Sequence, residues 1–194
     1  NLTDCLKDEP SKKKNEPNKN PEKETDKKKL NGSLLVLSKI LSNEFLYNEI
    51  RAKGGAYGAG ISCNVSAGTF STYSYRDPNL KKTVDVYEEI PNIIKNLDLS
   101  INDISRFIIG TVGSMDAPMT ERKKGYFDLT NYLMGRDSEY YDKVLNEVLN
   151  TNLEELKSYA EIFKNASTSE CLTVIGSEEA IDAEKTLFKK IASL

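Results

Sequence analysis

Histidine is absent from all 194 residues, and only three cysteines occur. Without histidine the chain cannot form a Ser-His or Cys-His nucleophile pair, and it cannot offer a histidine ligand to zinc. Cys5, Cys63 and Cys171 lie far apart without a C-x-x-C pair, which excludes a zinc knuckle and a local redox motif. We interpret Cys63 and Cys171 as small apolar residues of strands.

Long apolar runs are absent as well. No stretch of about 18 apolar residues occurs, so no segment is predicted to span a membrane. The first residues lack the basic start and apolar middle of a signal peptide, and without an initiator methionine we expect an excised or internal fragment. The net charge is only -3 and the lysines gather near the N-terminus, so the rest is mildly acidic and no nucleic-acid partner is expected.

Residues 7–29 differ sharply in composition from the rest of the chain. They contain nine lysines and six acids, with no apolar side chain apart from proline. Such a segment cannot bury enough surface to offset the entropy of ordering it. Residues 1–29 are therefore predicted to be a disordered Lys/Asn-rich insertion or linker, and residues 30–194 a folded domain. Lys27-Lys28-Lys29 could form a nucleic-acid patch, but the interleaved acids favour a solvated spacer.

A helix followed by a hairpin is predicted after residue 30. Apolar residues recur near helical spacing at Leu34, Leu35, Leu37, Leu41, Phe45, Leu46 and Ile50. Ser33 suits the N-cap, and Gly54-Gly55 is predicted to end the helix because glycine tolerates a left-handed cap. Residues 57–75 then alternate like two strands, with a turn at Ala67-Gly68.

The middle of the chain is predicted to be a series of helices. The first starts at Asp77-Pro78, as cap and first-turn proline, and runs to about Leu97 with a bend at Pro91. Two later helix starts have the spacing of a capping box, namely Ser100 with Asp103 and Thr151 with Glu154.

The last segment is predicted to be a strand and a helix. Leu172 to Ile175 indicates a short buried strand, and Gly176-Ser177 indicates the cap of a helix that carries Ile181, Leu187, Phe188 and Ile191. The order helix, hairpin, helices, strand and helix is typical of an α+β domain with a small antiparallel sheet packed against several helices. Three strands make a thin sheet for so many helices, so we expect partner strands upstream of this chain.

Two other kinds of site are disfavoured. A dinucleotide fingerprint or a P-loop needs its glycines before a helix N-terminus, whereas Gly54 to Gly60 follows a helix and enters a strand. Adjacent acids on a helix point apart, which favours solvated faces over acid-base chemistry at Glu88-Glu89, Glu154-Glu155 and Glu178-Glu179.

Arg51 and Tyr57 remain as candidate catalytic residues, with two interpretations. In the first, Arg51 complements the helix dipole, the glycines cap the helix and Tyr57 packs at a strand start. In the second, the tight turn brings two donors, a guanidinium and a phenol, to one point where a carbonyl becomes an oxyanion. Composition and spacing alone favour the first interpretation, and both stay open.

The sequence around this turn also resembles a known family. Asn48-Glu49-Ile50-Arg51-x-Lys53-Gly54-Gly55-Ala56-Tyr57-Gly58 is similar to the C-terminal-half motif of the M16 (pitrilysin, or inverzincin) zinc metallopeptidases, in their presequence-protease branch. The glycine pair resembles that branch more than the insulin-degrading enzymes. Residues 172–180 resemble the end of the family, so the resemblance covers about residues 33–194 and implies an M16-like C-terminal domain.

The resemblance implies a mechanism divided between two halves of a longer chain. The family's zinc is bound by an inverted His-x-x-Glu-His motif in the N-terminal half, and this chain lacks that motif. The two halves close around an unfolded peptide, and an arginine and a tyrosine of the C-terminal half hydrogen-bond substrate carbonyls. Carried over, Arg51 would bind a backbone carbonyl and the Tyr57 hydroxyl would stabilise the oxyanion.

We therefore expect the C-terminal part of a zinc metallo-endopeptidase that degrades short unfolded peptides and is inactive by itself. Its expected partners are the N-terminal half, which would bind the zinc, and the peptide substrates. No metal ligand and no cofactor-binding residue is predicted within this chain. The alternative is a non-catalytic M16-like scaffold or peptide-binding subunit that keeps the motif for its shape. The resemblance implies an organellar or vacuolar location, for which the sequence itself holds no address.

Overall fold

The computed structural model describes residues 30–167 and 171–192. Helices predominate, and within these residues the only sheet is a two-stranded antiparallel hairpin, so the predicted α+β class is confirmed. In chain order the elements are α1 (Ser33–Ile40), η1 (Leu41–Ala52), β1 (Gly58–Asn64), β2 (Thr69–Tyr75), α2 (Leu80–Glu88), α3 (Ile90–Lys95), α4 (Ile101–Met115), α5 (Glu121–Leu133), α6 (Ser138–Leu149), α7 (Leu153–Ser158), α8 (Ala160–Ser167), α9 (Glu178–Ala183) and η2 (Lys185–Leu187).

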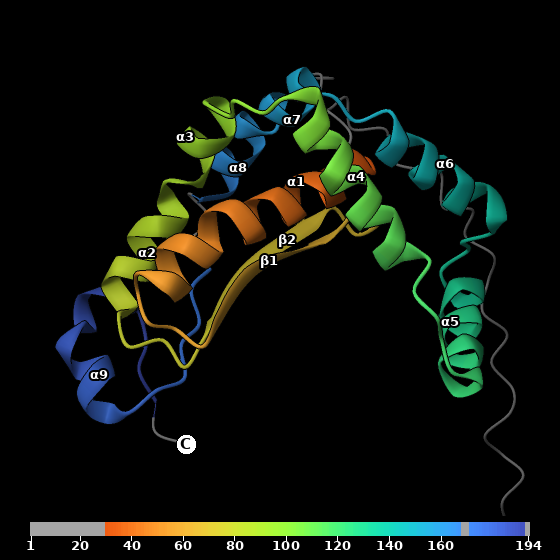
Figure 1. Ribbon diagram of the computed structural model, residues 1–194. Helices are drawn as coiled ribbons and strands as arrows, with labels where there is room; N and C mark the ends of the chain where they lie inside the picture. The colour runs from red at the N-terminus through yellow and green to blue at the C-terminus, as the bar shows by residue number, and fades with distance from the viewer. Residues whose placement is uncertain (1–29, 168–170, 193–194) are drawn as a thin grey trace, which may run out of the picture.

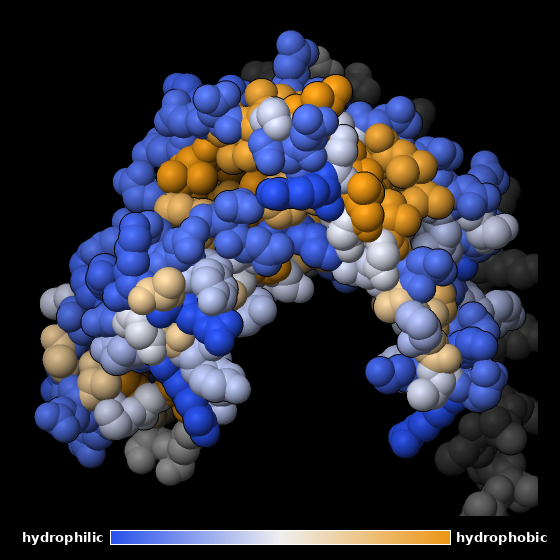
Figure 2. All heavy atoms as spheres, viewed as in Figure 1, coloured by the Kyte–Doolittle hydropathy of each residue, from blue (hydrophilic) through white to orange (hydrophobic). Residues whose placement is uncertain are grey.

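The elements form an arch (Figure 1). The α1–η1 rod and the hairpin lie side by side beneath the crown, α3, α7 and α8 lie at the crown, and α9 and α5 form the two feet. Figure 2 shows the hollow between the feet. None of the described helices combines the length and the apolar character that crossing a membrane requires.

The hydrophobic core lies around the α1–η1 rod. Leu37 and Leu41 on one part of the rod, and Leu46 further along, are completely buried. Each fully buried leucine stabilises the fold by about 1.5–3 kcal/mol through its removal from water. On β2, the Phe70 ring stacks on Phe163 of α8 with centroids 4.1 Å apart, which joins the hairpin to the crown. The burial of these leucines confirms the apolar pattern predicted for the α1–η1 rod.

The rod begins in a different way from the prediction. The π-helical η1 continues α1 without a break, which confirms a helix to about residue 51. Ser33, however, is the first helical residue and not the N-cap. The Asn31 side chain accepts hydrogen bonds from the Ser33 N–H at 3.0 Å and the Ser33 hydroxyl at 2.6 Å. Asn31 is itself held by Glu155 and Tyr159, so contacts from far along the chain determine the cap.

The hairpin is confirmed, including its turn. Gly58 pairs with Tyr75 at its open end, and Gly68 in the connecting turn has a φ of 65°. Ile61 of β1 faces the core, where its N–H donates to the Ser42 hydroxyl at 3.1 Å. The opposite face of the hairpin is more open and carries the exposed tyrosines of β2.

The helix predicted from Asp77-Pro78 starts later and is divided. α2 begins at Leu80, and the Asp77 carboxylate, which is not its N-cap, accepts hydrogen bonds from the Asn79 N–H and the Thr83 hydroxyl. The chain separates into α2 and α3 just before Pro91, which lies in the first turn of α3. Proline has no N–H to donate to the preceding turn, so a new helix start is its favoured place.

One of the two predicted capping boxes is confirmed. The Asp103 N–H donates to the Ser100 hydroxyl, and the Asp103 carboxylate accepts from the Ser100 N–H, both at 3.2 Å. The box predicted at Thr151 is wrong, because Asn152 is the N-cap of α7 and accepts from the Glu155 N–H at 3.0 Å. The Thr151 hydroxyl instead bonds back to a carbonyl in the last turn of α6.

The predicted strand at residues 172–175 is wrong. These residues have no strand partner in the described part of the chain, and Leu172 and Ile175 are exposed. A β-branched run forms a strand only where a neighbouring strand completes its ladder. Cys171 is exposed outside a strand, whereas Cys63 lies partly buried in β1 as predicted. Ser177 does cap α9, but that helix is only six residues long. The predictions for residues 1–29 lie outside the described residues.

Candidate functional site

The turn at Gly54-Gly55 ends η1 with a left-handed glycine. Gly55 has a φ of 81°, and its N–H donates to the Arg51 carbonyl at 2.9 Å, which is the bond of an αL cap. The Ala56 N–H donates to the Ile50 carbonyl at 3.1 Å, and this wider loop is in keeping with the π-helical winding. Because Ala56 is buried, the turn fixes the point at which the chain enters the hairpin.

Arg51 lies exposed in the last turn of η1. Its guanidinium stacks over the ring of Tyr47, 5.1 Å from the centroid, as residues four apart on a helix can. No acid of the described residues lies within ion-pair distance of Arg51. Its planar set of N–H donors therefore remains available to a ligand.

Tyr57 immediately precedes β1 and is 66% exposed. Its N–H donates to the Tyr75 carbonyl at 3.0 Å, which continues the pairing of the hairpin by one residue. The two rings meet edge to face, with centroids 5.9 Å apart and planes at 84°. The guanidinium of Arg76 lies over the Tyr57 ring, 5.9 Å from its centroid. Tyr57 is thus held by its backbone and its ring, while much of the side chain faces solvent.

Arg51 and Tyr57 lie at the two ends of one turn, but each has its own aromatic or cationic neighbour. Arg51 is stacked on Tyr47, and the arginine beside Tyr57 is Arg76, which lies outside the motif that contains the other two residues. One signal pointed to it. Arg76 directly follows β2, and a hairpin returns the end of its second strand to the start of its first.

The chemistry of this site is that of hydrogen-bond donation. Guanidinium and phenol N–H and O–H groups can bind a carbonyl oxygen, or the negative charge that develops on it. The sequence offers no histidine, and in the described part no group of three acids or cysteines could hold a metal. Burial raises the pKa of the Cys63 thiol to about 11, although the Ser38 hydroxyl offsets part of that rise. This thiol therefore stays protonated near neutral pH and is a poor nucleophile.

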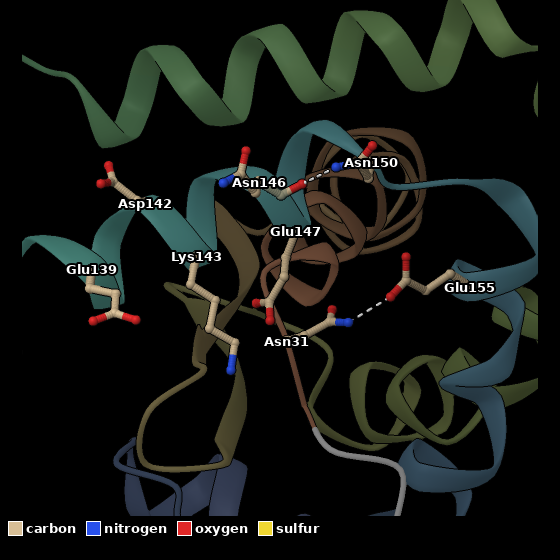
Figure 3. Close-up of a pocket in the computed structure, with 8 residues that line it drawn as sticks. All are labelled: Asn31, Glu139, Asp142, Lys143, Asn146, Glu147, Asn150 and Glu155. Carbon is tan, nitrogen blue, oxygen red and sulfur yellow. Dashed lines mark hydrogen bonds between the residues drawn. The ribbon is translucent and has the colours of Figure 1, made fainter.

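A pocket of about 590 Å³ lies elsewhere, between α6, Asn31 and Glu155 (Figure 3). Its lining carries four carboxylates against the single lysine Lys143. Two of the carboxylates have structural roles: Glu147 accepts from the Gly32 N–H at 2.8 Å, and Glu155 accepts from the Asn31 amide at 2.6 Å. We interpret this pocket as the polar end of the α1 cap, and neither Arg51 nor Tyr57 lines it.

Comparison with known proteins supplies the family. The model of the PreP C-terminal domain matches residues 24–178. The chain is 34% identical over 86% of its length to Protein HypA of Clostridium perfringens, covering 17% of that protein. It is 36% identical over 79% of its length to Presequence protease 1, chloroplastic/mitochondrial, of Arabidopsis thaliana, covering 14% of it. It is 31% identical over 78% of its length to the mitochondrial presequence protease of Yarrowia lipolytica, covering 15%.

The chain thus spans about one sixth of the length of these relatives or less. The match of the family model includes the whole α1–η1 rod, the glycine turn and the hairpin. The chain therefore belongs to the PreP C-terminal domain family.

Proposed function

We propose that this chain is the C-terminal part of a zinc metallo-endopeptidase of the M16 family, which degrades short unfolded peptides in a closed chamber made by two halves. The observation that carries the proposal is the glycine turn with Arg51 and Tyr57 at its ends, both exposed and both hydrogen-bond donors. Two of the relatives named above are presequence proteases, which supports a peptidase.

Arg51 and Tyr57 have separate roles in this proposal. The Arg51 guanidinium donates to a backbone carbonyl of the bound peptide and so fixes its register. The Tyr57 hydroxyl donates to the oxygen of the scissile carbonyl as that oxygen becomes negative. A donor that is already in place needs no reorganisation during the reaction, and its loss typically costs about 3–4 kcal/mol of transition-state stabilisation.

The proposed zinc would belong to the N-terminal half of the longer protein. Among the described residues no cluster of acids or cysteines could hold the metal, the sequence has no histidine, and neither proposed role passes through the zinc. The chain alone is accordingly expected to have no peptidase activity. Its partners are the N-terminal half of the same enzyme and unfolded peptides, and no nucleic acid is expected.

The presequence proteases among the relatives are named as mitochondrial or chloroplastic, which supports an organellar location for this protein. A closer resemblance, suggested by the Lys/Asn-rich composition of residues 7–29, is to falcilysin, the malaria-parasite member of the family. That resemblance implies the parasite's digestive vacuole and plastid as the location.

A non-catalytic scaffold or peptide-binding subunit of the same fold is the second candidate. It is favoured by the stacking of Arg51 on Tyr47, because a cation held on an aromatic ring can stabilise the C-terminal end of the helix dipole without binding a substrate. In that case the turn is kept because it closes η1 and starts the hairpin.

Substitution of Tyr57 in the full-length enzyme separates the two candidates. Tyr57→Phe removes only the hydroxyl, so kcat for peptide cleavage should fall by about 100- to 1000-fold. The melting temperature should stay within about 1 °C, because changes at exposed positions usually alter stability little. Tyr132→Phe is the matched control, because Tyr132 is also exposed but lies on α5 at the far foot of the arch. Turnover by Tyr57→Phe equal to that of the control would refute the oxyanion role.

Substitution of Arg51 tests the carbonyl contact. Arg51→Lys keeps the positive charge but loses the planar set of donors, so kcat/KM should fall at least tenfold. Its kcat/KM should be little higher than that of Arg51→Gln, which has no charge. Cleavage at the wild-type rate by the lysine variant would contradict a positioned guanidinium.

A further inference from the structure

Arg76 adopts a backbone conformation that arginine rarely takes. Its φ is 49°, and it is the only non-glycine residue with positive φ in the described part of the chain. The left-handed region brings Cβ close to the following carbonyl, which is why glycine and asparagine normally occupy it. Such a residue persists only where its surroundings hold it, and such positions cluster at functional sites.

The segment after Arg76 is fastened directly to the glycine turn. The Asp77 carboxylate accepts from the Asn79 N–H at 2.9 Å and from the Thr83 hydroxyl at 2.6 Å, which orders the turn between β2 and α2. The Asn79 side-chain amide then donates to the Gly54 carbonyl. Three hydrogen bonds therefore link the end of β2, the start of α2 and the turn that ends η1.

This backbone directs the Arg76 side chain over two tyrosines. Its guanidinium carbon lies 5.5 Å from the centroid of the Tyr75 ring and 5.9 Å from that of Tyr57, within the range of a cation–π contact. Tyr75 also meets the edge of the Tyr57 ring. The Tyr57 ring is thus bounded by a guanidinium and by a second ring. No acid in the described residues is within ion-pair distance of Arg76, so the stacking is not a by-product of a salt bridge.

We infer that Arg76 is a positioning residue, which holds the Tyr57 ring so that its hydroxyl is presented to the substrate carbonyl. This inference rests on the proposed function of Tyr57 and adds a residue to it. Because Arg76 acts through the ring, its effect should reach catalysis only while Tyr57 carries its hydroxyl. The unfavourable backbone conformation of Arg76 is then maintained for the site and not for the fold.

A double-mutant cycle in the full-length enzyme tests the inference. Arg76→Gln in the wild-type background should lower kcat by about 2- to 5-fold, the range of one exposed cation–π contact, with KM changed less than twofold. In the Tyr57→Phe background the same substitution should change kcat less than twofold. Arg136→Gln is the matched control, since Arg136 also stacks on a tyrosine, 5.7 Å from the Tyr140 ring, and lies between α5 and α6.

The outcomes separate this inference from the proposed function. If Tyr57→Phe itself has no effect, the proposed function of Tyr57 fails and the inference falls with it. If Tyr57→Phe lowers turnover but Arg76→Gln does not, or if the two losses multiply, the positioning role alone is overturned.

A glycine substitution distinguishes positioning from a structural role. Arg76→Gly relieves the left-handed backbone and removes the side chain, so the melting temperature should be equal to or above that of the wild type while kcat falls as in Arg76→Gln. Arg76→Lys, which keeps a cation near the rings, should recover part of kcat. A glycine variant with a lower melting temperature and unchanged kcat would show that Arg76 serves the fold.

Discussion

At the scale of single residues, two tyrosines differ in how their hydroxyls are satisfied. The Tyr159 hydroxyl, in the core, contacts the Ser33 hydroxyl at 2.9 Å and donates to the Asn31 side chain at 2.8 Å. The Tyr87 hydroxyl is buried without a hydrogen-bond partner in the described structure. Burial raises the pKa of Tyr87 to about 12; the nearby Ser74 hydroxyl offsets part of that rise, although it lies outside hydrogen-bond geometry. The two phenols are chemically alike but should contribute oppositely to stability.

Phenylalanine substitutions at these two positions should therefore give different results. Tyr159→Phe should lower the free energy of unfolding by about 1–2 kcal/mol, because it removes hydrogen bonds from a buried network. Tyr87→Phe should leave the free energy unchanged or raise it, because it removes a polar group that burial desolvates. Urea unfolding of each variant at pH 7 measures both values. A larger loss for Tyr87→Phe than for Tyr159→Phe would contradict the assignment of these hydroxyls.

The candidate site shows which residues a sequence can reveal. Arg51 and Tyr57 lie within one short motif, where a helix stop and a strand start follow directly from the residue types. Arg76 could not be found in the same way, because its place over Tyr57 depends on the register that sets Gly58 opposite Tyr75. It also depends on a positive φ at Arg76, a backbone conformation that would not be predicted for an arginine.

At the scale of elements, local signals predicted helices better than their ends. The Ser100 capping box involves only neighbouring residues and was predicted correctly. The N–H of Ser33 is instead bound by the Asn31 side chain, and Asn31 is held by Glu155 and Tyr159 from the far end of the chain. Residues 172–175 have the composition of a strand, but a strand is a property of a pair. Residues 172–175 have no strand partner in the described chain, and this depends on the tertiary structure, which a local sequence pattern cannot predict.

The glycine turn allows a matched test at this scale. Gly55→Ala should lower the free energy of unfolding by about 1–2 kcal/mol, because alanine is strained at a φ of 81°. Space is not the cause, since a Cβ at Gly55 would meet its nearest atom, of Pro78, at an ordinary 3.7 Å. Gly58→Ala is the control: its Cβ would meet nothing within 4 Å and it lies in β1. Chemical unfolding measures both changes in free energy. Equal changes for the two substitutions would show that the left-handed conformation of Gly55 does not contribute to the stability of the turn after η1.

At the scale of the whole molecule, the arch is unevenly stabilised. The buried rod lies beneath the crown, whereas the foot formed by α5 buries only Asn131 of its thirteen residues. Tyr126, Tyr132 and Leu133 on this helix are exposed. A helix of this length is marginal in water unless tertiary contacts support it, so the feet and the crown should differ in local stability.

Tyr141 of α6 makes two contacts that support α5. The Tyr141 hydroxyl donates to the Asn131 side chain at 2.7 Å, and the Tyr141 ring lies 5.5 Å from that of Phe127. Tyr141→Phe keeps the ring contact and removes the hydrogen bond, which is worth about 1 kcal/mol.

Amide hydrogen exchange of the chain should resolve this difference. Protection in α5 should be at least 100-fold lower than in α1, because local opening of α5 exposes little that is buried. Tyr141→Phe should accelerate exchange in α5 by about fivefold, the kinetic equivalent of one lost hydrogen bond, while exchange in α1 stays unchanged. If α1 and α5 were protected equally and accelerated together, the arch would open as one cooperative unit, and α5 would be as integral to the fold as the rod beneath the crown.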